Sequence, residues 1–312
     1  MKEKVSIITG ASGEIGQNLI ARFEKIKGKK IIALDLNPPN KELNFYKFIK
    51  GSILDSEIIN ELAENYIIEE IFHLAAVLST KAEKNPELAT QVNINGTQVL
   101  LEEMKDKEIK KFIFASSSSV YGNNDKIPFS ETDMVDQQIS PYGATKKMGE
   151  ELCFTYAHLY QIPTVCLRFF TVYGPRQRPE MAIHKFVRHI LSGQPLPFFG
   201  DGSTARDYTY IDDIISGIIA ALESNEDFMI YNLGNSEPVK LADLVSTISD
   251  VTGEKAFLDE QALPSGDVQR TYADISRAES RLDYSPTTHF YDGVVKFVDW
   301  FKSVKTEHPQ LF

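Results

Sequence analysis

The 312-residue sequence is poor in cysteine and contains only Cys153 and Cys166. Two cysteines are too few for a disulfide framework or a thiolate metal cluster, so the small disulfide-bonded and zinc-binding classes are excluded. No stretch approaches the ~18 uncharged apolar residues of a spanning helix. Residues 1–4 lead directly into a short apolar run at Val5, which is too short for a secretory signal. We therefore expect a reduced, cytoplasmic protein with no bound metal and no membrane partner.

Positive charge is also scarce, because 33 Lys and Arg residues face 44 Asp and Glu residues and the net charge is −11. A chain this acidic, without a Lys/Arg tract, is a poor partner for nucleic acid or for an anionic membrane. Apolar residues make up 42% and charged residues 25% of the sequence, which is ordinary globular usage. At about 150 residues per domain, the length predicts two domains or one large one.

The first half alternates strand and helix patterns, which predicts an α/β protein with a Rossmann-like, doubly wound parallel sheet. Its short apolar runs suit strands that are buried on both faces. The predicted strands are Val5–Thr9, Lys30–Leu34, Glu69–Leu74, Lys111–Ala115 and Thr164–Phe169. The predicted helices are Ile15–Ile26, Ser56–Tyr66, Pro86–Met104 and Ser140–Tyr160.

From Gly174 onward, prolines interrupt the pattern and the helices are separated by short strands. We expect a smaller C-terminal α/β substrate-binding domain over residues 173–312, packed on a first domain over residues 1–172 to which residues 207–233 return. Ligands of such proteins bind in the cleft between the domains. The elements predicted in this half are the helices Ile183–Leu191, Asp212–Leu222, Leu241–Thr252 and Tyr291–Val304 and the strand Met229–Leu233.

A glycine-rich turn joins the first predicted strand to the first predicted helix. Glycines at this spacing allow a tight turn, a close approach of the backbone to a diphosphate, and close helix–sheet packing. The helix N-terminus adds free N–H groups and a partial positive charge. The alternative is an ordinary glycine-rich turn. The residues predicted to hold the diphosphate of a dinucleotide are Gly10, Ser12, Gly13, Glu14, Ile15 and Gly16.

Asp35 ends the second predicted strand, roughly 20 residues beyond the glycines, where a carboxylate accepts hydrogen bonds from an adenosine ribose. Its charge would repel a 2′-phosphate, and neither Arg nor Lys follows it in Leu36-Asn37-Pro38. These features favour NAD over NADP as the cofactor. The alternative is a solvated aspartate in a turn.

Tyr142 and Lys146 lie four residues apart at the start of a predicted helix, behind Ser140-Pro141, which is typical of an N-cap and first helical position. This spacing puts both side chains on one face. A nearby ammonium and the positive helix end would lower the phenol pKa from its reference value near 10 and suit Tyr142 to acid–base chemistry. A Tyr and a Lys at this spacing also occur by chance on helix surfaces.

Hydroxyl groups follow another predicted strand, in Ser116-Ser117-Ser118-Ser119. The carboxyl end of a parallel strand points into the crevice where ligands bind, so one of these hydroxyls would orient a reacting sugar oxygen toward Tyr142. A polar turn after a strand is the common alternative.

Taken in order, the glycine loop, Asp35, His73-Leu74-Ala75-Ala76, the serine run and the Tyr142/Lys146 pair resemble the extended short-chain dehydrogenase/reductase family. The resemblance covers nearly the whole chain. Residues 167–176 and 200–210 are similar to its nucleotide-sugar branch, and residues 176–182 are most similar to UDP-glucuronate 4-epimerases. The family implies a homodimer formed through the helices Pro86–Met104 and Ser140–Tyr160, with Leu88, Val92, Leu152 and Phe154 as candidates for the shared face.

Carried over to this sequence, the resemblance implies roles for individual residues. Tyr142 would be the acid/base, Lys146 would bind the nicotinamide ribose, and Ser117 would contact the 4-oxygen of the sugar, whereas His73 is expected to be structural. The implied cofactor contacts are Leu36, Ser52, Ile53, Leu74, Ala75, Ala76 and Asn93. The implied substrate contacts are Ser117, Ser118, Thr171, Arg178, Arg206 and Asp267.

The sequence departs from the family pattern at four places. Ser52 stands where an adenine-binding aspartate is usual, and Asp55 is better interpreted as a helix N-cap. Ser118-Ser119 replaces the acidic pair of the sugar 4,6-dehydratases, so water elimination lacks its usual groups. Residues 77–86 look more like a short-chain threonine dehydrogenase loop, and Pro264 replaces an arginine. These departures leave the identity of the sugar open.

The leading hypothesis is a NAD-dependent epimerase that acts at carbon 4 of a nucleotide hexose or hexuronate through a bound 4-keto sugar. A nucleotide-4-keto-sugar reductase using NADH or NADPH is an alternative, because the same residues serve a single hydride transfer. Threonine dehydrogenase chemistry and a non-catalytic NAD sensor are weaker alternatives.

Arg178 would pair with a uronate carboxylate or, equally, would anchor its own loop or a phosphate. Between Val165 and Tyr210 six basic residues face three acidic ones. This local net charge of +3 favours an anionic substrate there.

Overall fold

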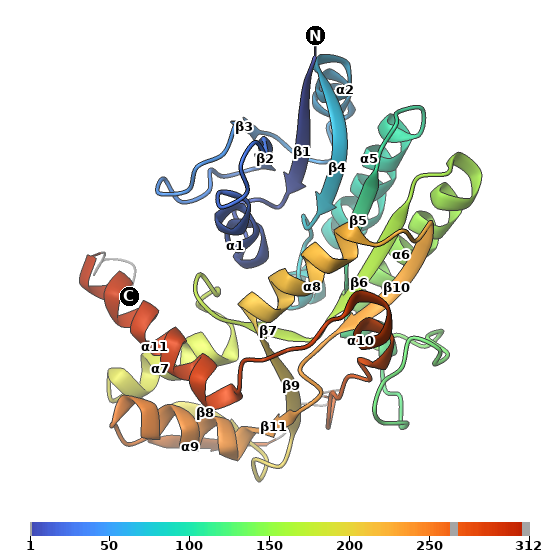
Figure 1. The fold of residues 1–312 in the computed structure, drawn as a ribbon. Helices are drawn as coiled ribbons and strands as arrows, with labels where there is room; N and C mark the ends of the chain where they lie inside the picture. Colours follow the sequence, from blue (N-terminus) through green and yellow to red (C-terminus); the bar gives the residue numbers. More distant parts are fainter. Residues whose placement is uncertain (1, 263–267, 308–312) are drawn as a thin grey trace.

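The computed structural model describes residues 2–262 and 268–307 and has two lobes (Figure 1). The larger lobe is built on a seven-stranded sheet in which every strand pair is parallel. This architecture confirms the predicted Rossmann-like, doubly wound sheet. In spatial order the strands are β10 (Phe228–Leu233), β6 (Thr164–Phe169), β5 (Lys111–Ser117), β4 (Tyr66–His73), β1 (Glu3–Thr9), β2 (Ile31–Asp35) and β3 (Lys47–Lys50).

Helices cover both faces of this sheet (Figure 1). One face carries α1 (Glu14–Phe23) and α8 (Ile211–Glu223), and the other carries α2 (Ser56–Asn65), α5 (Gly96–Met104) and α6 (Pro141–Tyr160). The strand order reverses direction at β1, which lies between β2 and β4. Such a switch point opens a crevice at the carboxyl ends of the strands, where ligands of this architecture bind.

The smaller lobe lies beyond the carboxyl ends of the large sheet (Figure 1). The chain returns from it to the larger lobe through α8 and β10, and α10 (Ser276–Leu282) packs against both of these elements. The strands of the smaller lobe are β7 (Thr171–Tyr173), β9 (Ala205–Tyr210) and β11 (Pro238–Lys240) in one sheet and β8 (Leu196–Phe199) and β12 (Leu258–Gln261) in another. Its helices are α7 (Ala182–Leu191), α9 (Leu241–Thr252) and α11 (Phe290–Glu307).

Two apolar clusters form the core. The cluster under α1 and α8 runs without a break from Phe23 in the larger lobe to Tyr173 and Phe297 in the smaller one. The other cluster fills the space between the sheet and α2, α5 and α6, and includes Ile7 and Phe112. Because burial of apolar area is the main stabilising term in folding, the shared first cluster fixes the two lobes against each other.

The structure differs from the predicted elements in several places. The predicted helix over Pro86–Met104 is divided into α4 (Pro86–Thr90), a π-helical turn η1 (Gln91–Asn95) and α5. The short helix α3 (Ser79–Lys84) and the edge strand β3 were not predicted, because few of their side chains are buried and a hydrophobic period is absent. Among the described residues, none of the helices combines the length and apolarity needed to cross a membrane.

Candidate active site

A cavity of about 350 Å³ opens at the carboxyl ends of the central strands, where the two lobes meet. Residues from the glycine loop, β5, α6 and the segment after β6 contribute its walls. The sequence-predicted residues that line it are Gly10, Gly13, Glu14, Ile15, Gly16, Leu74, Ala76, Ser117, Ser118, Tyr142, Lys146, Thr171 and Arg178. The fold therefore brings the three predicted catalytic residues together with most of the predicted diphosphate loop.

The glycine loop has the geometry of a diphosphate cradle. Gly10 has φ +68°, and a Cβ there would lie 2.6 Å from the Ala75 nitrogen. A Cβ on Gly16 would lie 2.5 Å from the Gly10 carbonyl oxygen, so α1 packs closely on the loop. Gly13 caps α1 without a side-chain hydrogen bond. No side chain therefore caps the N–H groups in the first turn of α1. Such free N–H groups at a helix N-terminus are suited to bind an anion.

Asp35 ends β2 beside this loop. Its carboxylate accepts hydrogen bonds from the backbone N–H of Ser12 (3.0 Å) and of Asn37 (3.1 Å). These contacts hold the carboxylate at the sheet edge where an adenosine ribose would approach. The Gly51 N–H donates to the Asp35 carbonyl (3.1 Å), which brings the following Ser52 to the same edge. Asp55 accepts from two backbone amides of α2, which confirms the predicted N-cap.

Several predicted cofactor residues lie outside the lining of the central cavity. Leu36 is exposed at the sheet edge next to Asp35, whereas Ile53 is buried. In the part of the chain that the structure describes, the predicted cofactor residues that do not line this cavity are Ser12, Asp35, Leu36, Ser52, Ile53, Ala75 and Asn93.

Tyr142 lies in the first turn of α6. Ser140 caps the helix by accepting a hydrogen bond from the Gly143 N–H (3.0 Å), and Pro141 occupies the first helical position, as predicted. The expected fall in the phenol pKa is not found. Burial raises the pKa of Tyr142 to about 12, although a hydrogen bond with Ser117 and the charge of Arg178 act in the opposite direction. Desolvation outweighs the stabilisation of a phenolate in the ligand-free protein.

Lys146 is buried one turn further along α6. Its Nζ lies 4.9 Å from the centre of the Phe114 ring and 5.8 Å from that of Tyr142. Burial lowers the pKa of Lys146 to about 8, against smaller opposing effects of Cys153, Cys166 and Glu150. The ammonium therefore remains mostly charged at neutral pH and lies close to the phenol.

Ser117 forms a polar corner at the end of β5. Its hydroxyl accepts from the Ser119 N–H (3.1 Å) and lies 3.1 Å from the Ser119 hydroxyl. It also forms the hydrogen bond to Tyr142 that lowers the phenol pKa. Two hydroxyl groups on different elements thus meet at one point of the cavity, as an acid–base site for a sugar hydroxyl requires.

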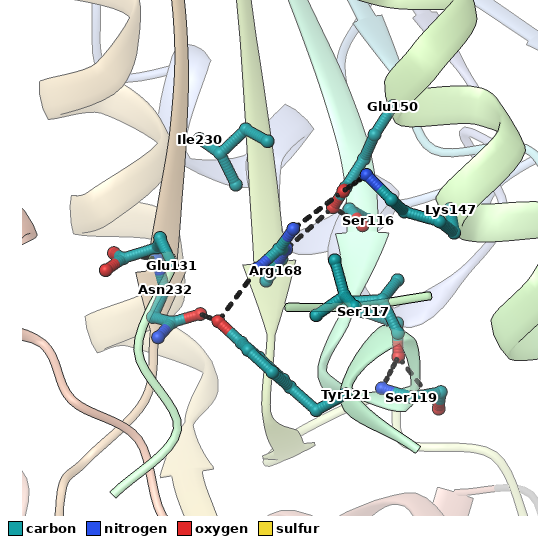
Figure 2. A network of polar contacts seen from close by, with 12 residues as sticks. Ser116, Ser117, Ser119, Tyr121, Glu131, Lys147, Glu150, Arg168, Ile230 and Asn232 are labelled. Carbon is teal, nitrogen blue, oxygen red and sulfur yellow. Dashed lines mark hydrogen bonds and ion pairs between the residues drawn. The ribbon is translucent and has the colours of Figure 1, made fainter. Parts of the chain in front are cut away.

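A buried ion pair lies behind this corner (Figure 2). Arg168 of β6 donates from Nε and Nη2 to the two carboxylate oxygens of Glu150, both at 2.8 Å, and each side chain is only 1% exposed. Ser116 donates to the same carboxylate (2.6 Å), and Arg168 donates to the Tyr121 hydroxyl (3.0 Å). Tyr121 in turn donates to Asn232 of β10 (2.7 Å). The network ties α6 to three neighbouring strands next to the predicted catalytic residues.

Asn93 lies in the π-helical turn η1 and is buried. Its side chain accepts from the Val77 N–H (2.7 Å) and donates to the Val77 carbonyl and to the Thr145 hydroxyl, both at 2.9 Å. Asn93 thus links the loop after β4 to α6, and its predicted contact with the cofactor stays a prediction. A π-helical turn often marks such a functional site.

His73 is structural, as expected. Its ring nitrogens lie 2.8 Å from the Thr9 hydroxyl and 2.9 Å from the Thr97 hydroxyl. Burial lowers the pKa of His73 to about 3, so the ring is neutral. Within residues 2–262 and 268–307, no group of three or more His, Cys, Asp or Glu side chains has the arrangement of a metal site.

A second cavity of about 300 Å³ lies in the smaller lobe and shares Thr171 with the first. Arg206 lines this second cavity together with Lys185, and aromatic side chains complete the wall. Arg178 lines the first cavity and forms an ion pair with Glu180 (2.9 Å). The predicted substrate residue Asp267 lies outside the described residues.

The sequence reasoning missed part of both walls. Leu78 and Ser79 reach the first cavity from the N-terminus of α3, in the segment 77–86 whose resemblance to a threonine dehydrogenase loop named no individual site residue. In the second cavity, Phe199 and Tyr208 come from the short strands β8 and β9, which were not predicted, although residues 200–210 carried the resemblance to the nucleotide-sugar branch. The missed residues are Leu78, Ser79, Ala115, Ser116, Ser119, Phe169, Phe170, Val172 and Met181 in the first cavity, and Glu180, Ala182, Lys185, Phe186, Pro197, Phe199, Thr204, Tyr208, Val239 and Leu241 in the second.

Comparison with known proteins agrees with this geometry. The chain is 37% identical to a UDP-glucuronate 4-epimerase of Thermodesulfobacterium geofontis over 95% of each chain. It resembles the crystal structure of the UDP-glucuronic acid 4-epimerase of Bacillus cereus in complex with UDP-glucuronic acid and NAD (TM-score 0.89, 36% identity, 96% of this chain and 99% of that one). It also resembles a UDP-glucose 4-epimerase of Thermotoga maritima with UDP-glucose (TM-score 0.91, 30% identity, 96% and 99%). Residues 6–234 match the model of the NAD dependent epimerase/dehydratase family. The chain belongs to this family.

Proposed function

We propose that the chain is an NAD-dependent 4-epimerase of a UDP-sugar and that a UDP-hexuronate is its first candidate substrate. The observation that carries the proposal is the meeting of Ser117, Tyr142 and Lys146 in a cavity with the glycine loop on one side and a second cavity on the other. The relatives named above, which include UDP-glucuronate and UDP-glucose 4-epimerases, support the choice of reaction and nucleotide.

The glycine loop and Asp35 would hold NAD, with the diphosphate at the N-terminus of α1 and the adenosine ribose at the carboxylate. The loop fits this group, because a Cβ on Gly10 or Gly16 would collide with the backbone that shapes it. Residues 1–172 would therefore bind mainly the cofactor, and residues 173–312 would bind mainly the nucleotide sugar. When bound, NAD supplies a hydride acceptor that can return the hydride.

Tyr142 and Ser117 share a hydrogen bond in the ligand-free protein, and the 4-hydroxyl of a sugar would replace it. Tyr142 would take the proton of that hydroxyl as the 4-keto sugar forms, and would give it back after the sugar has turned over. Lys146 would keep a positive charge close to the phenol, which favours the phenolate while the proton is held there. Phe169 and Phe170 line the cavity with buried apolar side chains, which would limit the access of water to the ketone.

Incubation of the purified protein with UDP-glucuronate, UDP-glucose and UDP-N-acetylglucosamine tests the proposal. We expect conversion of at least one sugar to its 4-epimer without added cofactor. Recovery of every sugar unchanged would contradict it, and turnover that consumes added NADH or NADPH would favour the 4-keto-sugar reductase instead.

Arg178 is proposed to select the sugar. If its guanidinium pairs with a uronate carboxylate, Arg178→Gln should raise KM for UDP-glucuronate by about tenfold or more and leave UDP-glucose nearly unaffected. A similar loss for both sugars would place the guanidinium on a phosphate. Arg176→Gln is a suitable control, because Arg176 donates to Asn18 (2.8 Å) and does not line the central cavity in the part of the chain that the structure describes.

We further propose a homodimer formed by the segment α4–η1–α5 and the adjacent helix α6. Leu159 and Phe154 of α6 are 61% and 51% exposed, and Leu88 of α4 is 42% exposed. Val92 and Leu152 are partly buried against the core and would contribute less. A substitution Leu159→Glu should shift the mass measured by light scattering toward the monomer. An unchanged mass, or a monomeric parent protein, would contradict the dimer.

A further inference from the structure

Glu14 is an unusual group in the central cavity. It lies directly after Gly13, in the first turn of α1, and its side chain lines the cavity. Its Oε1 atom is buried and has no hydrogen-bond partner among the residues that the structure describes. A buried carboxyl oxygen without a partner is costly, so its presence calls for a group that binds there.

The charges around Glu14 define its chemistry. Arg178, in the segment after β7, is the charged group whose field favours the ionised carboxyl, but burial outweighs it and raises the pKa of Glu14 well above its usual value. Tyr142 and Lys146 of α6 share the cavity. On α8, which packs against α1, the buried Asp213 carboxylate is occupied by the amides of residues 287 and 288.

We propose that Glu14 acts as a neutral carboxylic acid that donates a hydrogen bond to an oxyanion bound at the N-terminus of α1. The inference rests on the proposed function, which places the NAD diphosphate and an anionic sugar in this cavity. A carboxylate at this point would repel either anion, whereas the protonated acid is a donor aimed into the cavity. At a pH above the pKa of Glu14 in the free protein, binding of the anion therefore takes up a proton, and Glu14 makes cofactor or substrate affinity depend on pH.

The direction of the pH effect follows from this assignment. The binding-competent form is protonated, so affinity is full at low pH and falls as the pH rises through the pKa of Glu14. A hydrogen bond to a charged group corresponds to about a tenfold or greater change in affinity. Glu14→Gln keeps a donor that never ionises, and should show the low-pH affinity of the parent protein at every pH. Glu14→Ala should bind weakly at every pH.

Calorimetric titration of cofactor-free protein with NAD tests the proposal between about pH 5.5 and pH 9, a range above the reference pKa of glutamate. Runs in two buffers of different ionisation enthalpy count the protons taken up. Glu57→Gln is the matched control, since Glu57 also lies in the first turn of a helix that follows a strand but is exposed. Proton uptake with NAD alone assigns the anion as the diphosphate. Uptake only when UDP-glucuronate, but not UDP-glucose, is added to the NAD-loaded protein assigns it as the sugar carboxylate.

No proton uptake in any arm, or Glu14→Gln with the same pH profile as the parent protein, would overturn the inference. The readout does not depend on turnover. If the protein takes up a proton through Glu14 on NAD binding but epimerises no sugar, the result contradicts the proposed function and supports the role of Glu14.

Discussion

The buried ion pair between Arg168 and Glu150 allows a test of how this fold is stabilised beside the proposed catalytic residues. Glu150→Gln keeps the shape of the side chain and removes its charge. The substituted amide retains one acceptor oxygen, but its NH₂ group would face an Arg168 donor that now bonds a carboxylate oxygen at 2.8 Å. The guanidinium would remain buried in a space where each partner is 1% exposed.

The magnitude follows from this burial. Removing one partner of a buried pair costs about 3–5 kcal/mol, because the remaining charge is left without compensation. Tyr121, which accepts from Arg168, is a neutral hydroxyl that cannot replace a carboxylate. Arg168→Met should cost less, since Lys147 Nζ already lies 3.7 Å from the Glu150 carboxylate and Ser116 donates to it. The double variant Glu150→Gln/Arg168→Met should be more stable than the sum of the two single changes predicts.

Urea unfolding of the parent protein and the three variants, followed by circular dichroism at constant pH, measures these differences. A free energy of unfolding for Glu150→Gln within about 1 kcal/mol of the parent would refute the reasoning, because it would mean that water or another group compensates the guanidinium. Additive losses in the double variant would refute the coupling. Glu151→Gln is the control, since Glu151 pairs with the same Lys147 but its side chain is 63% exposed.

Three further outcomes are expected. Tyr142→Phe should lower kcat by about 10²–10⁴-fold with unchanged NAD content by absorbance, as loss of a general acid/base does; wild-type kcat would contradict its role. Gly10→Ala should destabilise the protein by at least ~1 kcal/mol, because φ is +68° there and a Cβ would lie 2.6 Å from the Ala75 nitrogen; a melting temperature equal to that of the parent would contradict the geometry. Lys146→Met should stabilise the cofactor-free protein near pH 7, since the folded pKa of Lys146 is lowered to about 8 and the buried charge is unfavourable. That gain should fade between about pH 8 and pH 10.5, where the unfolded chain binds more protons than the folded one and the parent becomes more stable with rising pH; a gain that stays constant in urea titrations across this range would contradict the pKa.

The basic residues between Val165 and Tyr210 show that a net charge counted along the sequence does not predict the charge around a cavity. Six basic residues face three acidic ones there, but they do not act as one group. Arg168 is neutralised by Glu150 in the core, and Arg176 bonds Asn18. Of these six basic residues, all of which the structure describes, only Arg178, Lys185 and Arg206 line the two cavities. Counting charge along the chain cannot separate them, because burial and pairing partners come from distant elements.

Tyr142 illustrates the same limit at a single residue. Its helical position and its proximity to Lys146 follow from local spacing and capping. The direction of its pKa shift does not, because the apolar residues packed around Tyr142, such as Ala82 of α3 and Ala89 of α4, lie more than 50 residues earlier in the sequence. The sequence shows the favourable charge of Lys146 but not the loss of water around the phenol. This desolvation dominates the pKa of Tyr142 in the ligand-free protein.

The amino-acid sequence by itself determined the alternation of strands and helices, the glycine loop, the caps and the pairing of Tyr142 with Lys146. Each of these depends on contacts within a few residues, which spacing and residue type encode. Only the tertiary structure decided that Asn93 holds the loop after β4 by hydrogen bonds and that Arg168 is buried in the core. It also decided that Glu14 has a buried oxygen without a hydrogen-bond partner among the described residues. These outcomes depend on burial and on partners 16 or more residues away, which become defined only when the sheet and its two lobes assemble.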